Sequence, residues 1–230
     1  MVDFHSHILP GVDDGSKSVE ESLALIDMLY RQGVDTVAAT PHFYADNESV
    51  DSFLKRREDA FLSIVPHLSK DSPTVLLGAE VSYYEGISRL NGLERLRIGD
   101  SKLLLMEMPC ARWSNSAVKE LLMLSSNPAI NLVIAHGERY LKLQSDETVN
   151  LLLQNDFLIQ TNASMYLSFF DRKAAIKGLK NGVYHLLGSD CHNTSTRPPR
   201  IGEAFEHIQN KLGADFVNDM CAFAYSLINK

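Results

Sequence analysis

Two histidines near the start of the chain, His5 and His7, stand two positions apart in the stretch Val2-Asp3-Phe4-His5-Ser6-His7. In an extended strand, residues two apart face the same side of the backbone. Both imidazoles can therefore reach one metal ion. A His-x-His pair by itself is more often part of the polar surface than of a metal site, so its role has to be inferred from the rest of the chain.

Short apolar runs alternate with amphipathic segments along the chain. Strands are predicted at residues 2–7, 34–39, 73–81, 103–108, 130–135, 157–161 and 184–188. Helices are predicted at residues 18–32, 50–68, 116–125, 147–154, 171–180, 201–211 and 214–228. Apolar strands separated by helices form parallel sheets covered on both faces. This order predicts an α/β fold, a distorted seven-stranded β/α (TIM-like) barrel in one domain spanning residues 1–230; a doubly wound open sheet is the alternative.

Metal-binding residue types gather where the predicted strands end. In a β/α barrel, the carboxyl ends of the strands meet at one face. The candidate ligands at these ends are His5, His7, Asp14, His42, Glu80, Glu107, His136, Asp190 and His192. Nine nitrogen and oxygen ligands exceed what one ion takes, and a set without thiolates suits Mn, Fe or Zn. We therefore expect two or three ions, with Asp14 a weak choice because Asp13 stands beside it.

Two arginines, Arg139 and Arg197, each follow a candidate ligand segment within a few residues. Arginine forks bind phosphate oxygens in a bidentate manner, and clustered ions activate water and stabilise an oxyanion. Together they favour phosphate binding beside a water-activating metal cluster, with the two arginines as catalytic, substrate-binding groups; a solvated loop arginine is the alternative for each taken alone. Phe43, Tyr44 or Trp113 could stack against an aromatic substrate, although each could equally serve packing.

Composition narrows the class of protein. The 230 residues are 45% hydrophobic, with a net charge of -7, which argues against a basic nucleic-acid-binding face. No apolar run is long enough to span a membrane, and no signal peptide is recognised at the start. Three cysteines fit a reducing, cytoplasmic environment better than a disulfide framework. Cys191 lacks the glycine-rich phosphate loop that a nucleophilic cysteine would need.

Several segments resemble the PHP (polymerase and histidinol phosphatase) superfamily, in particular the bacterial tyrosine-protein phosphatases of capsular and exopolysaccharide operons. The segments that carry the resemblance are Asp3-Phe4-His5-Ser6-His7, Val12-Asp13-Asp14-Gly15, Thr40-Pro41-His42, Gly78-Ala79-Glu80, His136-Gly137-Glu138-Arg139-Tyr140, Ser189-Asp190-Cys191-His192-Asn193 and Arg197-Pro198-Pro199. They occur in order from residue 3 to residue 199. One departure is the loop after His42, which lacks the basic residues associated with relatives.

The resemblance implies a PHP fold and a trinuclear site, commonly holding Mn2+, formed by the nine candidate ligands. It also implies that Asp14 rather than Asp13 is the ligand, because the superfamily's aspartate directly precedes glycine. The expected reaction is hydrolysis of phosphotyrosine on the operon's own autophosphorylating tyrosine kinase. Three alternatives stay open: a small-molecule phosphatase of the histidinol-phosphate type, a metal-dependent amidohydrolase, and a catalytically silent, metal-stabilised binding domain.

Overall fold

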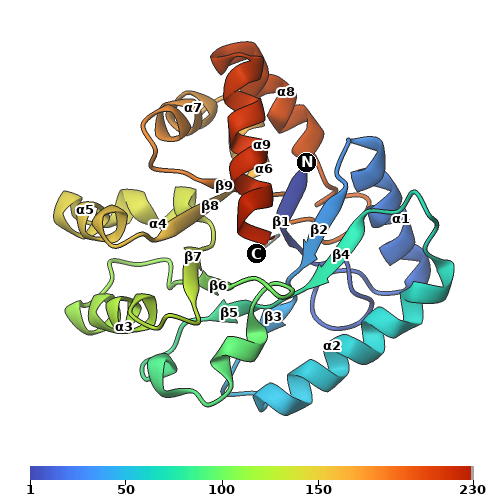
Figure 1. Ribbon diagram of the computed structural model, residues 1–230, viewed down its shortest axis with the longest axis horizontal. Helices are drawn as coiled ribbons and strands as arrows, with labels where there is room; N and C mark the ends of the chain where they lie inside the picture. The colour runs from blue at the N-terminus through green and yellow to red at the C-terminus, as the bar shows by residue number, and fades with distance from the viewer. Residues whose placement is uncertain (229–230) are drawn as a thin grey trace.

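Within residues 1–228, which the computed structural model describes, nine short parallel strands curl into a barrel with helices around its outside (Figure 1). The strands are β1 (Val2–Ser6), β2 (Thr36–Ala39), β3 (His42–Phe43), β4 (Thr74–Leu77), β5 (Glu80–Ser82), β6 (Leu103–Glu107), β7 (Asn131–Ile134), β8 (Leu158–Asn162) and β9 (Leu186–Gly188). The helices are α1 (Val19–Arg31), α2 (Val50–Ile64), α3 (Asn115–Ser125), α4 (Gly137–Tyr140), α5 (Asp146–Gln154), α6 (Ala163–Leu167), α7 (Arg172–Lys180), α8 (Ile201–Leu212) and α9 (Ala214–Ile228).

The predicted β/α barrel is confirmed, but the count of seven strands is slightly off because two of them are broken. The second continues beyond Pro41 as β3, and the third breaks at Gly78 into β4 and β5. Proline has no N–H to donate to a strand ladder. Pairing nevertheless continues across the breaks, since the N–H of Gly78 donates to Ala39 O at 2.9 Å and that of Glu80 to Pro41 O at 3.0 Å.

The strand order runs β1-β2-β4 in one sheet and β3-β5-β6-β7-β8-β9 in the other. The segment after β9 then returns to β1, where the N–H of Asp190 donates to His5 O at 2.8 Å. β1 also carries an irregularity against β2 between Asp3 and Ser6. Such bulges bend a strand and redirect its side chains, and this one contains His5.

Apolar side chains fill the barrel, and α9 covers its amino-terminal end. Val2, Phe4 and Ala38 pack there with Ala224 and Tyr225 of α9, and Figure 1 shows α9 lying over β1. The carboxyl ends of the strands are thus left for the candidate site. Among the described helices, none combines the length and the apolar character needed to cross a lipid bilayer.

The loop between β1 and α1 folds back tightly over His7. The N–H of Ser16 donates to His7 O at 3.0 Å. A Cβ added at Gly15 would lie only 2.3 Å from the same oxygen, so only glycine fits there. Ser18 then caps α1, as the sequence predicts, by accepting a hydrogen bond from the N–H of Glu21 at 3.3 Å.

Candidate metal centre

All nine predicted ligands lie together at the carboxyl ends of the strands. They form four overlapping groups in which the ligand atoms are within 4.8 Å of one another: His7, Asp14, His42 and His192; His5, His136 and Asp190; His5, His7 and Glu80; and His42, Glu80 and Glu107. The remaining three histidines of the chain, His67, His185 and His207, belong to none of these groups. The fold therefore brings together nine candidate ligands that are spread over nearly 190 residues of the sequence.

Glu80 is at the centre of the cluster and is fully buried. Its Oε2 lies 3.1 Å from His5 Nε2 and 3.4 Å from His7 Nε2. The same oxygen is 3.0 Å from His42 Nδ1, while Oε1 lies 2.9 Å from His136 Nε2. One carboxylate thus faces four imidazoles, so Glu80 would contact more than one ion if several were bound.

Four of the five imidazoles are oriented by a hydrogen bond at Nδ1, which leaves Nε2 directed into the cluster. These bonds run from His5 to Gln160 Oε1 (3.2 Å), from His7 to Asp13 Oδ2 (2.6 Å), from His136 to Asn162 Oδ1 (3.1 Å) and from His192 to the Asp190 carbonyl (3.0 Å). Outer partners of this kind fix the tautomer and ring orientation of a metal-binding histidine. The geometry is that of a preorganised metal site.

Three of these orienting groups, Asp13, Gln160 and Asn162, were not predicted as site residues. Asp13 also accepts hydrogen bonds from the N–H groups of Gly15 and His42, both at 2.9 Å. Gln160 and Asn162 stand two apart on β8, so strand alternation could have placed both on the inner face. Asp13 carried no comparable signal, because its adjacency to Asp14 made the two look interchangeable.

The charges in the cluster favour cations. Burial would lower the pKa of His7, but the adjacent carboxylates of Asp13 and Glu80 raise it to about 10. Burial would raise the pKa of Glu80, yet the charge of His5 and imidazole hydrogen bonds hold it well below its ordinary value. Burial and the nearby charge of His7 lower the pKa of His192 to about 4.

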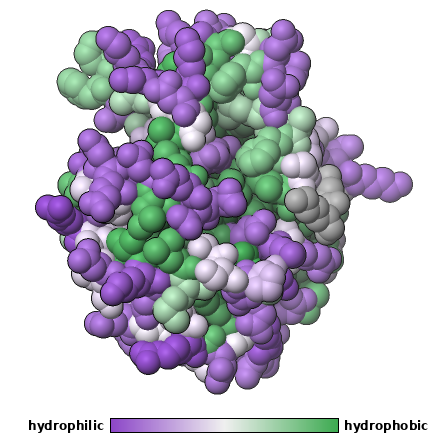
Figure 2. All heavy atoms as spheres, turned by 60° about the vertical axis from the view of Figure 1, so that its left-hand side comes forward, coloured by the Kyte–Doolittle hydropathy of each residue, from purple (hydrophilic) through white to green (hydrophobic). Residues whose placement is uncertain are grey.

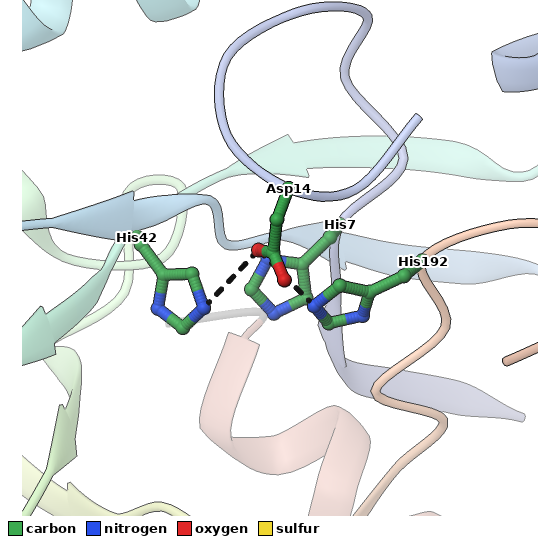
Figure 3. Close-up of side chains that lie close together, drawn as sticks. All are labelled: His7, Asp14, His42 and His192. Carbon is green, nitrogen blue, oxygen red and sulfur yellow. Dashed lines mark ion pairs between the residues drawn. The ribbon is translucent and has the colours of Figure 1, made fainter. Parts of the chain in front are cut away.

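The residues present fit a bound metal. Glu80 Oε2, His42 Nδ1 and His192 Nε2 are buried without a hydrogen-bond partner, and such groups normally have one. His5 Nε2 and His7 Nε2 lie 3.1 Å apart, a separation expected of two ligands about 2.1 Å from one ion. Figure 3 shows Asp14 extending toward His42 and His192, with Oδ1 3.5 Å and 3.4 Å from their Nε2 atoms.

Two of the candidate ligands have strained backbones. His136 and Asp190 have φ values of 50° and 53°. These lie in the left-handed region, which residues other than glycine seldom adopt. Each lies two residues after the end of a strand, and its side chain belongs to the cluster. Strain of this kind persists where surrounding contacts hold it and is concentrated at functional sites.

Arg139 and Arg197 are both 42% exposed at the side chain and meet at the edge of the cluster. Their Nη2 atoms lie 3.2 Å and 2.9 Å from Asp190 Oδ2. The two arginines and Asp190 line one cavity of about 440 Å³. An anion in this cavity would therefore contact both guanidinium groups beside the candidate ligands.

The predicted contact of Phe43 with substrate is wrong. Phe43 is fully buried and packs against Phe53 of α2, with ring centroids 5.1 Å apart. Neighbouring strand residues face opposite sides, so His42 points into the cluster and Phe43 away from it. Tyr44, 41% exposed and 5.5 Å from His42 between ring centroids, is an exposed aromatic residue beside the site.

Cys191 lies within the candidate site segment but is fully buried. Burial raises the pKa of its thiol, which is opposite to the shift that activates a nucleophilic cysteine. The structure thus agrees with the sequence in giving this thiol no nucleophilic role.

These observations define a parallel β/α barrel with a cluster of imidazoles and carboxylates at its strand ends that is able to hold metal ions. The model of the capsular polysaccharide synthesis family CpsB/CapC matches residues 1–227. The chain belongs to this family.

This chain is similar to named relatives and to solved structures over most of their length. Tyrosine-protein phosphatase CpsB of Streptococcus pneumoniae is 34% identical, covering 93% of this chain and 92% of the relative. Tyrosine-protein phosphatase YwqE of Bacillus subtilis is 26% identical, covering 94% and 86%. A structure from a study of YwqE and CpsB as metal-dependent tyrosine phosphatases superposes with a TM-score of 0.86 at 22% identity, covering 100% of this chain and 94% of that chain.

The orienting role of Asp13 can be tested with Asp13→Asn. An amide offers one oxygen and one NH2 group, so it cannot accept from both His7 Nδ1 and the Gly15 N–H. We expect metal affinity to fall about 10–100-fold, as for other outer-shell partners, in a protein with unchanged circular dichroism. Calorimetric metal titration measures this, with the exposed Asp27→Asn as control. Wild-type affinity in Asp13→Asn would contradict the role.

Proposed function

We propose that this chain is a metal-dependent tyrosine-protein phosphatase. The observation that carries the proposal is the cavity in which Arg139 and Arg197 converge on the candidate ligand Asp190. A phosphoryl group held there would lie between two guanidinium groups and the metal cluster. The names of the CpsB and YwqE relatives point to the same reaction.

The two arginines would bind the phosphoryl oxygens and stabilise their growing charge during in-line displacement. Bound divalent ions supply an activated water and a Lewis acid. Asp13, Gln160 and Asn162 keep the histidine ligands in place. Tyr44 would contact the phenol ring at the mouth of the site, where it is half-exposed.

We further propose that the residues predicted from the sequence are the ligands of two or three ions, with Mn2+ the expected metal and Fe or Zn alternatives. Carboxylates and imidazoles without thiolate suit this group of metals. The proposed partner is the cognate autophosphorylating tyrosine kinase of capsule or exopolysaccharide synthesis, in the cytoplasm. The family match and the three free cysteines support this assignment.

Phosphate release tests the function directly. We expect Mn-stimulated release from a phosphotyrosine peptide, loss of release with a chelator, and recovery when metal is restored. His136→Ala should lose both release and bound metal, because its Nε2 lies 2.9 Å from Glu80. The exposed His67→Ala serves as the matched control.

Histidinol phosphate is the comparison substrate. The histidinol phosphate phosphatase of Lactococcus lactis, solved with zinc, L-histidinol and phosphate, shares the fold at a TM-score of 0.58 and 12% identity, covering 95% of this chain and 93% of that chain. Faster release from histidinol phosphate than from the peptide would replace the tyrosine phosphatase proposal with a metabolic one. Release from neither would indicate a binding domain.

A further inference from the structure

Two adjacent phenylalanines are exposed in the turn between α6 and α7. The side chains of Phe169 and Phe170 are 76% and 89% exposed. Their rings meet edge to face with centroids 5.5 Å apart. Scattered apolar residues are normal on a protein surface, but a contiguous exposed aromatic pair marks an interaction site.

Local hydrogen bonds hold this turn in place. Ser168 Oγ donates to Asp171 Oδ2 at 2.7 Å, and the N–H of Asp171 donates back to Ser168 Oγ at 3.3 Å. The guanidinium of Arg172 lies 5.3 Å from the centroid of the Phe169 ring. The two phenylalanines are therefore presented on an ordered turn, which reduces the entropic cost of using them as anchors.

The turn adjoins the proposed phosphate site. Arg139 and Asn162 line one cavity of about 330 Å³ together with Ser168 and Asp171, which flank the phenylalanines. Arg139 also lines the cavity shared with Arg197. A polypeptide that extends from the phosphate site along this cavity would pass close to the turn that carries Phe169 and Phe170.

The helix that follows the turn is strongly basic, although the chain as a whole has a net charge of -7. α7 carries Arg172, Lys173, Lys177 and Lys180 and no acidic residue. Its Arg172 and Lys173 line a further cavity of about 370 Å³ with His207 and Lys211 of α8. Figure 2 brings α7 forward and shows hydrophobic groups among hydrophilic ones on this part of the surface.

We propose that Phe169, Phe170 and the basic surface of α7 dock the substrate segment that flanks the phosphotyrosine. This inference rests on the proposed phosphatase function and names a preferred substrate, a phosphotyrosine with an apolar side chain and acidic residues nearby in sequence. Aromatic anchors next to positive charge match such a segment in both chemistry and charge. The metal centre hydrolyses the ester, and this surface selects the protein chain that carries it.

The double variant Phe169→Ala/Phe170→Ala tests the docking contact. Two substrates are compared, free phosphotyrosine and a phosphotyrosine peptide with acidic and apolar flanking residues. We expect kcat/KM for the peptide to fall about 10-fold or more, mostly through KM, because interface anchors contribute on that scale. Hydrolysis of free phosphotyrosine should not change. Leu62→Ala/Met123→Ala, which removes two exposed apolar side chains elsewhere, is the matched control.

Charge reversal tests the second component. Lys173→Glu/Lys177→Glu should weaken the peptide reaction and reduce its salt dependence, whereas Lys119→Glu on α3 should have no effect. Unchanged peptide kinetics in both Phe169→Ala/Phe170→Ala and Lys173→Glu/Lys177→Glu would overturn the proposal. Equal losses with peptide and free phosphotyrosine would also overturn it, because the turn would then support the site itself.

Two further outcomes distinguish substrate docking from a failure of the phosphatase proposal and from binding to a membrane. If wild-type protein hydrolyses neither substrate, the phosphatase proposal fails, and docking is measured as peptide binding by fluorescence anisotropy, which the phenylalanine variant must weaken. Binding of the protein to vesicles that contain anionic lipid tests whether the turn contacts a membrane surface instead. Vesicle binding that the phenylalanine variant loses, together with wild-type peptide kinetics, would assign the turn to lipid and overturn substrate docking.

Discussion

Glu80→Gln should abolish turnover and lower the number of bound metal ions. The substitution keeps the shape of a side chain that faces four imidazoles within 3.4 Å. It removes the negative charge, and it places an NH2 group where an oxygen now faces ligand nitrogens. We expect kcat to fall by more than about 100-fold, the upper range for outer-shell partners alone.

Metal analysis beside steady-state kinetics makes this test specific. Glu120→Gln is the control, because Glu120 is a partly buried carboxylate that accepts hydrogen bonds from Tyr83 and Gly86 away from the cluster. Its activity and metal content should match those of wild type. Full metal content and normal turnover in Glu80→Gln would show that Glu80 is required neither for metal binding nor for catalysis.

Arg139→Ala and Arg197→Ala should each lower kcat about 100–1,000-fold, the range for loss of one oxyanion donor. Both guanidinium groups contact Asp190 at the edge of the cluster and are accessible from the cavity. Lysine at either position should give an intermediate loss, because it keeps the charge but not the planar fork. Phosphate release from a phosphotyrosine peptide is the measurement.

Bound metal again separates the possible causes of such a loss. If the arginines bind the phosphoryl group, the alanine variants keep the wild-type metal content and lose inhibition by free phosphate. Loss of metal would instead show that the arginines mainly hold Asp190. Arg31→Ala, which removes an exposed arginine paired with Asp27 on α1, should leave both readouts unchanged.

Strand ends were predictable because short apolar runs and helical hydrophobic patterns are local properties of the chain. Those patterns placed the nine candidate ligands at the ends of the predicted strands, and the parallel barrel then brings such ends together. The sequence predicts the end of the second strand before Pro41 but neither its continuation as β3 nor the break of the third strand at Gly78.

Phe43 shows a failure that local reasoning could have avoided. Its neighbour His42 was already placed in the cluster, and alternation in a strand then directs Phe43 toward α2. Asp13 shows a different kind of failure. The resemblance selects Asp14 as the ligand because it precedes glycine, but the orienting contact of Asp13 with His7 depends on how the loop folds back.

The sequence by itself determined the types of side chain at the site, their order and the class of fold, because residue chemistry and hydrophobic period are written along the chain. The tertiary structure alone decided which carboxylate is central, which groups orient the histidines, and that an aromatic turn lies beside Arg139. These depend on distances between residues far apart in sequence, such as Glu80 and His136 or His5 and Gln160. Such distances are set by which strands pair and by the closure of the barrel, which are properties of the whole fold.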